Sequence, residues 1–402
     1  GQNSDLLFFV FNHFNLCMKR NVYLDNSATS WPKPPQVMQE MSNYLENYGG
    51  SPGRSGHHFA LEAGRQIFEA RELIRDFFNA PASERVIFTA NSTHAINMAL
   101  KGLLKENDHV VVSSMEHNSV IRPLRYLEKE RKISITVVEY PSNGEFPAEK
   151  LENAICDNTK LVCLLHGSNV LGSVIPLNIA GEICKRKNVL FMVDAAQTAG
   201  FVPIDMQKDN IDILSFTGHK KLYGPSGTGG LCFGENVEIE PVFQGGSGSK
   251  SESELHPDFY PDKLEGGTKN TLGIIGLKAG MQYIQKKGMN VIREHCLRLR
   301  QAFIDGLSEI EETEVFLPST KEVLPVVSLN FKNHISSDIA EKLDRDFGIM
   351  IRVGLHCSPL AHKTIGTFPH GTARFSFGCF NTLDEVNYAI NAIKVVLKNE
   401  KS

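Results

Sequence analysis

An aspartate and a lysine follow two apolar runs of the chain and could act on one bound group. Asp194 closes the run 189–193, and Lys220 follows the run 211–215 in a glycine-rich segment. A buried carboxylate needs a cationic partner such as a pyridinium N–H, and a lysine in this position can form a Schiff base. The two residues lie 26 positions apart, about one strand–helix–strand unit, so both should emerge at one edge of a sheet. Taken alone, Asp194 could cap a helix, and Lys220 with Lys221 could be a surface charge pair.

A second motif, residues 89–94, places hydroxyl groups where a strand gives way to a helix. Its sequence is Thr-Ala-Asn-Ser-Thr-His. The free N–H groups and the dipole at such a helix start bind phosphate, and Ser92 and Thr93 add hydroxyl donors. The alternative is that Ser92 or Thr93 is an ordinary helix N-cap.

A cysteine and an arginine complete the set. Cys357 lies beside His356 in a loop with Gly354 and Pro359, unlike the cysteines in apolar runs. A thiol near cationic groups ionises readily and then acts as a nucleophile. Arg374, in a strand-like segment, could clamp a carboxylate or pair with a neighbouring side chain. A lysine, an aspartate and a phosphate cradle at one sheet edge are what pyridoxal phosphate requires.

The elements that must position these residues alternate between short apolar strands and helices from about residue 60 to 235. The predicted strands are 86–89, 110–113, 161–165, 189–194, 211–215 and 229–233, and the predicted helices are 92–103 and 179–187. Nearly continuous apolar strands between helices indicate a mostly parallel sheet covered on both faces. Ligands of such sheets bind beyond the C-terminal strand ends, where the motifs lie.

The pattern changes after about residue 285 to that of a smaller α+β unit. Its predicted helices are 291–307, 337–347 and one from about 383, and its predicted strands are 326–331, 349–352 and 372–376. We therefore predict an α/β protein in three parts. These are an N-terminal extension (1–20), a large cofactor-binding domain (21–284) whose N-terminal part is able to pack with the small domain, and a small C-terminal domain (285–402) that carries Cys357.

Composition excludes several classes of protein. The chain has 402 residues, with 42 Lys+Arg against 46 Asp+Glu and a net charge of −4. No strongly basic field attracts nucleic acid or anionic lipid, and no apolar run approaches the roughly 18–20 residues of a membrane helix. We expect neither nucleic acid nor a membrane as a partner.

The eight cysteines form no C-x-x-C pair. This argues against a structural metal site and against a disulfide framework, and it favours a reducing, cytoplasmic location. We expect the seven cysteines other than Cys357 to be buried as small hydrophobes. At the N-terminus, no basic residue precedes the apolar stretch Leu6–Phe11, as a secretory signal would require. Met18 is a plausible start, and we leave residues 1–17 out of the fold.

With these motifs the chain resembles the fold-type I, class V aminotransferase family, in its cysteine desulfurase branch, over nearly its whole length. The resemblance rests on segments 22–29, 115–118, 168–172, 194–197, 217–220 and 265–271 and on the Arg374 segment. It implies a large domain with a mostly parallel seven-stranded sheet. The short Arg-x-Gly-x-His-Cys loop at 352–357 is similar to the group II, Suf-type and selenocysteine-lyase-like branch. Leu355 stands where that branch often has histidine, which leaves the sulfur or selenium preference and the persulfide acceptor open.

The resemblance implies a role for each candidate residue. Lys220 would form the Schiff base with pyridoxal phosphate and remove the Cα proton, and Asp194 would pair with the pyridine nitrogen. The other cofactor contacts would be Gln197 with the phenolic oxygen, His117 stacked on the ring as a proton shuttle, and Ser92, Thr93, Thr217 and His219 on the phosphate. Thr268 would reach the phosphate of a partner subunit. The substrate would be bound by Arg374 through its carboxylate, by Asn169, and by His57 at the mouth of the site.

The implied activity is a cysteine desulfurase that converts L-cysteine to L-alanine and leaves the sulfur on Cys357 as a persulfide. L-selenocysteine is a further candidate substrate. A homodimer, a sulfur-acceptor protein and a place in iron–sulfur cluster assembly are implied with it. One alternative is another pyridoxal phosphate enzyme of class V, an aminotransferase, epimerase or other lyase, in which Cys357→Ala stays active. The other is a nucleotide-binding or non-catalytic α/β scaffold, which would be colourless.

Overall fold

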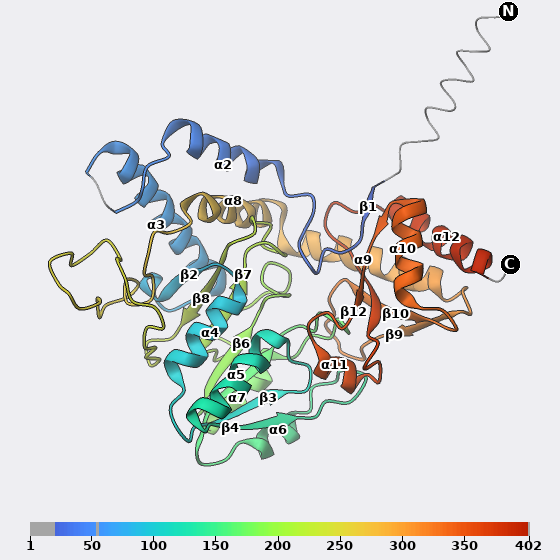
Figure 1. Cartoon of the computed structure of the whole chain (residues 1–402), viewed down its shortest axis with the longest axis horizontal. Coiled ribbons are helices and arrows are strands. Elements are labelled where there is room, and N and C mark those ends of the chain that lie inside the picture. Colours follow the sequence, from blue (N-terminus) through green and yellow to red (C-terminus); the bar gives the residue numbers. More distant parts are fainter. Residues whose placement is uncertain (1–20, 54–55, 401–402) are drawn as a thin grey trace, which may run out of the picture.

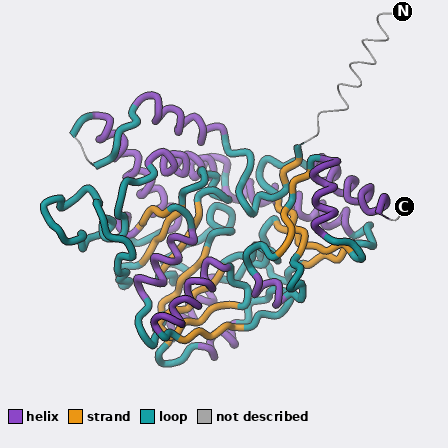
Figure 2. The backbone as a smooth tube through the Cα atoms, in the orientation of Figure 1, coloured by secondary structure: helices purple, strands orange, loops and turns teal. Residues whose placement is uncertain are grey.

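The computed structural model describes residues 21–53 and 56–400 (Figure 1). The predicted N-terminal extension, residues 1–20, lies outside the described residues. Two sheets dominate the arrangement, one of seven strands and one of four. Figure 2 shows helices flanking the strands of both sheets. The division into a large and a small domain at residues 284 and 285 stays a prediction.

The larger sheet is mostly parallel, as the sequence predicts. Its strand order is β2-β8-β7-β6-β5-β3-β4, and only β8 runs antiparallel to its neighbours β2 and β7 among these strands. The strands are β2 (Val86–Thr89), β3 (His109–Ser113), β4 (Ser134–Val138), β5 (Thr159–Leu165), β6 (Leu190–Asp194), β7 (Ile213–Thr217) and β8 (Gly229–Phe233). The seven-stranded, mostly parallel sheet is therefore confirmed.

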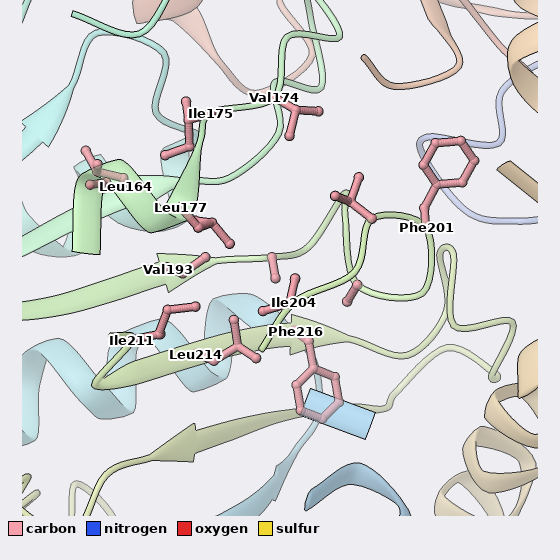
Figure 3. Packing of buried hydrophobic residues seen from close by; sticks show 14 of the residues in the cluster. Leu164, Val174, Ile175, Leu177, Val193, Phe201, Ile204, Ile211, Leu214 and Phe216 are labelled. Carbon is pink, nitrogen blue, oxygen red and sulfur yellow. The ribbon is translucent and has the colours of Figure 1, made fainter. Parts of the chain in front are cut away.

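Helices cover both faces of this sheet because its strands carry apolar side chains on both faces. One buried cluster joins Val110 and Val112 of β3 to α4 (Ser92–Leu103) and α5 (Asn118–Arg131). The opposite cluster joins Val111 to helices on the other face, and Figure 3 shows part of it, with Leu164, Val193 and Leu214 from neighbouring strands. The helices on that face are α3 (His58–Phe78), α7 (Leu177–Arg186) and α8 (Thr271–Lys287).

The smaller sheet is antiparallel, with the order β12-β13-β10-β9. Its strands are β9 (Thr313–Phe316), β10 (Val326–Phe331), β12 (Arg352–Gly354) and β13 (Thr372–Ser376). A third buried cluster packs them against α9 (Met289–Leu307), α10 (Ser336–Phe347) and α12 (Leu383–Glu400). Figure 1 shows α8 and α9 running one after the other from the seven-stranded sheet toward the four-stranded one.

The predicted strand 349–352 is divided in the structure. Ile349–Met350 forms β11, which pairs in parallel with β1 (Val22–Tyr23), whereas Arg352 begins β12 in the four-stranded sheet. The two halves pair with partners distant in sequence, which an apolar pattern cannot specify. The remaining elements are α2 (Pro35–Asn47), a 3-10 turn (Ser83–Arg85), α6 (Ala148–Ala154) and α11 (Pro359–Thr364).

The expectation of buried cysteines is wrong at one position. Cys163, Cys184, Cys232 and Cys296 are buried, Cys379 is half-buried, and Cys156 is exposed. Cys156 lies in the turn between α6 and β5, where its Sγ contacts His109 Nδ1 at 3.3 Å and Asn158 Oδ1 at 3.2 Å. Polar partners in a turn replace the apolar packing that we predicted. Cys17 lies outside the described residues. Within the described part of the chain, no helix combines the length and apolarity needed to cross a bilayer.

Candidate active site

A cavity of about 90 Å³ lies at the C-terminal ends of β5, β6 and β7. The sequence predicts that Asp194 and Lys220 meet at one sheet edge, and both line this cavity. The structure brings most of the predicted cofactor residues together there. The predicted residues in its lining are Ser92, Thr93, His117, Asn169, Asp194, Gln197, Thr217, His219 and Lys220.

Asp194 ends β6 and is 1% exposed. Its Oδ1 accepts hydrogen bonds from the Ala196 N–H at 2.9 Å and from Ser92 Oγ at 3.2 Å. Burial raises the pKa of the Asp194 carboxyl, opposed by those hydrogen bonds and by the charge of Lys220. A pyridinium N–H entering the cavity would supply the missing cationic hydrogen-bond donor.

Lys220 follows β7, is half-buried and is one of the residues that line the cavity. Burial lowers the pKa of its amine to about 8, against the attraction of Asp194. An amine with this pKa is partly unprotonated near neutral pH and can act as a nucleophile or base. Lys221 instead packs its Nζ 4.8 Å from the centre of the Phe201 ring, away from the cavity. Of the two adjacent lysines, only Lys220 lines the cavity.

His117 caps the N-terminus of α5 and lines the cavity. Its Nδ1 accepts the Ser119 N–H at 3.0 Å, so the neutral ring carries its proton on Nε2. Burial lowers the pKa of His117 to about 4, helped by the charges of Lys220 and Arg352. His117 is therefore a neutral ring with one N–H at physiological pH.

The start of α4 forms one wall of the cavity. Asn91 is the N-cap, and its Oδ1 accepts the His94 N–H at 2.9 Å. The Ser92 and Thr93 hydroxyls in the first helical turn therefore have no capping role. The alternative that Ser92 or Thr93 is an ordinary helix N-cap is wrong. A helix start with free N–H groups and two hydroxyls is suited to binding a phosphate.

Two further side chains that line the cavity, Gln197 and His219, each have a buried polar atom that a bound ligand could contact. Gln197 Nε2 donates to Ser27 O at 2.9 Å, while its Oε1 is buried without a partner among residues 21–53 and 56–400. The same is true of His219 Nδ1 within that described part of the chain. Unpaired buried polar atoms facing a cavity are costly and point to a ligand. The donor and acceptor set of the cavity fits pyridoxal phosphate.

Arg374 lies in β13 beside the cavity and is 1% exposed. Its Nη2 donates to Asp25 Oδ1 at 2.6 Å and its Nη1 to Asn169 O at 3.1 Å. Its Nε has no hydrogen-bond partner among the described residues. Burial lowers the pKa of Arg374, although Asp25 opposes this effect. Arg374 keeps a buried donor available for a carboxylate.

Cys357 is exposed in the loop between β12 and α11. His356 and Cys357 both adopt left-handed backbone conformations, with φ of 48° and 60°. Non-glycine residues hold this conformation only when their surroundings fix it, and the Asn118 N–H bonds Cys357 O at 2.8 Å. Arg352 Nη2 lies 3.8 Å from Cys357 Sγ, so a cation adjoins the thiol.

Two predicted residues lie elsewhere. Thr268 is exposed and lines a separate cavity of about 450 Å³ with Phe243 and Gly267. His57 is exposed at the N-cap of α3, where its Nδ1 accepts the Ala60 N–H at 3.3 Å. Neither side chain reaches the Lys220 cavity of the same chain.

The sequence analysis missed three residues of this site. Asp25 binds Arg374, Ser119 orients His117, and Arg352 adjoins Cys357. Arg352 stands in the Arg-x-Gly-x-His-Cys segment, so its place near the thiol had a signal in the sequence. Asp25 stands in segment 22–29, which contributes to the resemblance, but its pairing with Arg374 had no local signal, because the two residues lie 349 positions apart.

Comparisons with known proteins identify the family of this chain. The family model described as aminotransferase class-V matches residues 22–388. A probable cysteine desulfurase of Methanothermobacter thermautotrophicus is 34% identical over 375 residues, which cover 92% of this chain and 93% of that protein. A cysteine desulfurase IscS of a Shewanella species is 31% identical, covering 94% of this chain and 92% of that protein.

Solved structures of cysteine desulfurases have the same overall fold as this chain. The apo structure of a cysteine desulfurase from Thermococcus onnurineus has a TM-score of 0.87 at 32% identity, covering 94% of this chain and 95% of that one. The Escherichia coli cysteine desulfurase CsdA, crystallised as the S-sulfonic acid, has a TM-score of 0.84 at 27% identity, with coverages of 94% and 95%. The fold therefore has solved counterparts among cysteine desulfurases.

Proposed function

Because this chain belongs to the aminotransferase class-V family, we propose that it is a cysteine desulfurase that uses pyridoxal phosphate. It converts L-cysteine to L-alanine and holds the sulfur on Cys357. One observation carries the proposal: an exposed thiol sits on a loop bonded to Asn169, which lines the same cavity as Lys220 and Asp194.

Different residues of the cavity would bind different parts of the cofactor. The start of α4, with Ser92 and Thr93, and the side chains of Thr217 and His219 would hold the phosphate. Asp194 would hold the ring nitrogen, Gln197 the phenolic oxygen and Lys220 the aldehyde carbon. When bound there, pyridoxal phosphate supplies an electron sink for bonds to the substrate Cα.

Arg374 and Asn169 orient the substrate. The buried Nε of Arg374 is free to donate to the cysteine carboxylate, and Asn169 O and Asp25 fix the guanidinium plane. A fixed guanidinium binds a carboxylate in one orientation. The substrate Cα is thereby directed toward Lys220.

Lys220 and His117 would transfer protons, and Cys357 would accept the sulfur. The Lys220 amine, with its lowered pKa of about 8, takes the Cα proton onto Nζ, and His117 holds a proton at Nε2 for return. The Cys357 sulfur attacks the substrate sulfur: an S–S bond forms, the Cβ–S bond breaks, and the electron pair of that bond stays on Cβ, which takes up a proton. The products are a Cys357 persulfide and alanine. Arg352 Nη2, at 3.8 Å from the Cys357 Sγ, places a positive charge beside the sulfur that attacks.

A product assay with two cysteine variants tests this function. We expect wild type, incubated with L-cysteine and a reductant, to release alanine and sulfide in equal amounts. Cys357→Ala should lose both products while it keeps its yellow colour. Cys156→Ala is the matched control, because Cys156 is the other exposed thiol of the described chain, and it should retain full activity.

The assay also separates the alternatives. Alanine retained in Cys357→Ala would make Cys357 a bystander and favour another class V reaction. A yellow wild type that releases no alanine would keep the cofactor and redirect the search to L-selenocysteine. A colourless protein would reject pyridoxal phosphate. Lys220→Ala that stayed yellow after desalting would reject Lys220 as the cofactor-binding amine.

The homodimer belongs to the same proposal. Large apolar side chains are exposed on α2 and α3, with Met38 at 61%, Leu45 at 63% and Phe68 at 59%. A second copy of the chain would cover them, and the exposed Thr268 would then reach the partner's phosphate. Sedimentation of Leu45→Glu against wild type tests this: a dimeric wild type and a monomeric variant are expected, and a monomeric wild type would reject it.

The short Cys357 loop favours the group II branch, with His57 at the mouth of the assembled site. We propose that a sulfur-acceptor protein takes the persulfide, in the cytoplasm and in iron–sulfur cluster assembly. Transfer of radiolabelled sulfur from Cys357 to a candidate acceptor measures this step, and no transfer above that to free thiols would reject a protein acceptor.

A further inference from the structure

The carbonyl oxygen of His219, the residue before Lys220, receives an unusual number of hydrogen bonds. Its donors are Thr29 Oγ1 at 3.0 Å, the Ser30 N–H at 3.1 Å, Ser30 Oγ at 3.3 Å and Lys33 Nζ at 2.6 Å. A carbonyl oxygen has two lone pairs, so this group is fully saturated. All four donors come from one short segment, residues 29–33.

Lys33 makes the shortest of these contacts. Its side chain is half-buried, and its Nζ also donates to Ser30 Oγ at 2.8 Å. Burial lowers the pKa of this amine to about 8. In the part of the chain that the structure describes, no carboxylate forms an ion pair with Lys33. Burying an ammonium without a counter-ion is costly, and here its hydrogen bonds go to the backbone beside Lys220.

The other end of the same segment reaches the substrate side of the site. Asp25 binds Arg374, and Ser27 O accepts from Gln197 Nε2. Ser27 N donates at 2.8 Å to the Oγ of Ser376, which lies two positions after Arg374 in β13. Residues 25–33 therefore connect the proposed carboxylate-binding arginine to the peptide that carries the proposed cofactor lysine.

We propose that Lys33, together with Thr29 and Ser30, is a positioning residue that fixes the 219–220 peptide and so aims the Lys220 amine. The inference rests on the proposed role of Lys220. The peptide unit is planar, so holding the His219 carbonyl oxygen also fixes the Lys220 N–H and Cα. Lys33 is not itself a lining residue of the cavity, and it contacts the site through the His219 carbonyl, so its effect on the Lys220 amine passes through the 219–220 peptide.

Three variants of the holoenzyme test this assignment. Lys33→Met removes the donor and keeps the length, whereas Lys33→Arg keeps a cationic donor. Lys160→Met is the matched control, because Lys160 is exposed on β5 at a distance from the cavity lining. For Lys33→Met we expect kcat to fall about tenfold, equivalent to about 1.4 kcal/mol, with KM for L-cysteine changed less than about twofold.

Two readouts do not depend on turnover. In Lys33→Met the visible circular dichroism of the bound cofactor should weaken, because Lys220 then holds it in several orientations. Hydrogen exchange at the Ser30 amide, whose N–H donates to the same His219 carbonyl at 3.1 Å, should become faster in the cofactor-free protein. Lys33→Arg should restore most of both signals, and Lys160→Met should match wild type.

The opposite results overturn the inference. Unchanged kcat and circular dichroism in Lys33→Met would mean that the other donors suffice without Lys33. Equal losses in Lys33→Met and Lys33→Arg, with an equal fall in the melting temperature, would mean that Lys33 serves only the fold. If wild type releases no alanine, the proposed reaction fails, but dichroism and hydrogen exchange still decide whether Lys33 positions Lys220.

Discussion

The Ser358 hydroxyl donates to Asn169 Oδ1 at 2.9 Å, directly after Cys357. The other end of the same amide, Asn169 Nδ2, donates to the His356 carbonyl at 2.8 Å, directly before Cys357. One side chain thus holds both neighbours of the thiol. Because Asn169 also lines the Lys220 cavity, one side chain joins the Cys357 loop to that cavity.

Loss of this support should slow sulfur transfer. Ser358→Ala removes one of the two bonds, which is worth about 1 kcal/mol, so we expect persulfide formation on Cys357 to slow about fivefold. The visible spectrum of the cofactor should stay unchanged. Rapid mixing with L-cysteine followed by alkylation and mass spectrometry measures the rate, and Ser142→Ala, in an exposed turn, is the control. An unchanged rate would show that Asn169 and Ser358 do not hold the loop in solution.

Substrate binding should depend on the geometry of Arg374 as well as its charge. A lysine at this position keeps the charge but loses the planar fork that Asp25 and Asn169 O fix. We expect Arg374→Lys to lower kcat/KM for L-cysteine about 100-fold, mainly through KM. Arg298→Lys, on the exposed side of α9, should behave as wild type. Equal KM values in both variants would contradict a role in carboxylate binding.

The charge of Arg352 should speed reactions of the Cys357 thiol. Its Nη2 lies 3.8 Å from Sγ, so its removal takes a cation away from the charge that develops at the sulfur as the reaction proceeds. Arg352→Met should slow alkylation of Cys357 by iodoacetamide at pH 7 about threefold, and Arg352→Lys should preserve the rate. Peptide mass spectrometry separates Cys357 from the exposed Cys156. A faster reaction in Arg352→Met would mean that the arginine mainly shields the sulfur.

Stability should depend on pH through Glu116, which is fully buried beside His117. Its Oε1 accepts from Ser113 Oγ at 2.6 Å and from the Leu165 N–H at 2.9 Å. Burial raises the pKa of Glu116 from 4.5 to about 8. The folded state therefore holds a proton that the unfolded chain releases, and its stability falls as pH rises from 4.5 to 8.

Glu116→Gln imitates the protonated carboxyl at every pH. We expect it to raise the melting temperature by about 2 °C or more at pH 8 and to leave it nearly unchanged at pH 4.5. Thermal scans of the cofactor-free protein at the two pH values measure the difference. A variant that is less stable than wild type at pH 8 would show that the ionised carboxylate is the native form.

Local residue patterns predicted six of the seven strands of the large sheet, whereas the edge strand β4 (Ser134–Val138), which is only partly buried, was missed and the count of seven came from the family resemblance. Valine, isoleucine and leucine runs bounded by polar residues mark β2, β3, β5 and β6, because a strand buried on both faces needs apolar side chains at every position. The C-terminal strand ends then place Asp194 and Lys220 at one edge. This is a consequence of parallel topology, which alternating strands and helices already imply.

Pairings between distant segments could not be predicted in this way. The division of 349–354 into β11 and β12 depends on β1, more than 300 positions earlier, and on β13. Cys156 looked like a buried cysteine until the fold placed His109 and Asn158 around its sulfur. Local patterns contain no record of such neighbours.

The sequence by itself determined the residue types of the site, the mostly parallel sheet and the edge at which the chemistry lies, because periodicity and spacing are local properties of the chain. Only the tertiary structure decided which groups hold these residues in place. Asp25 on Arg374, Asn169 around Cys357 and Lys33 on the His219 carbonyl each join positions 186 or more apart. Such contacts form only when the whole chain has folded, since hydrogen bonds between distant segments depend on the packing of everything between them.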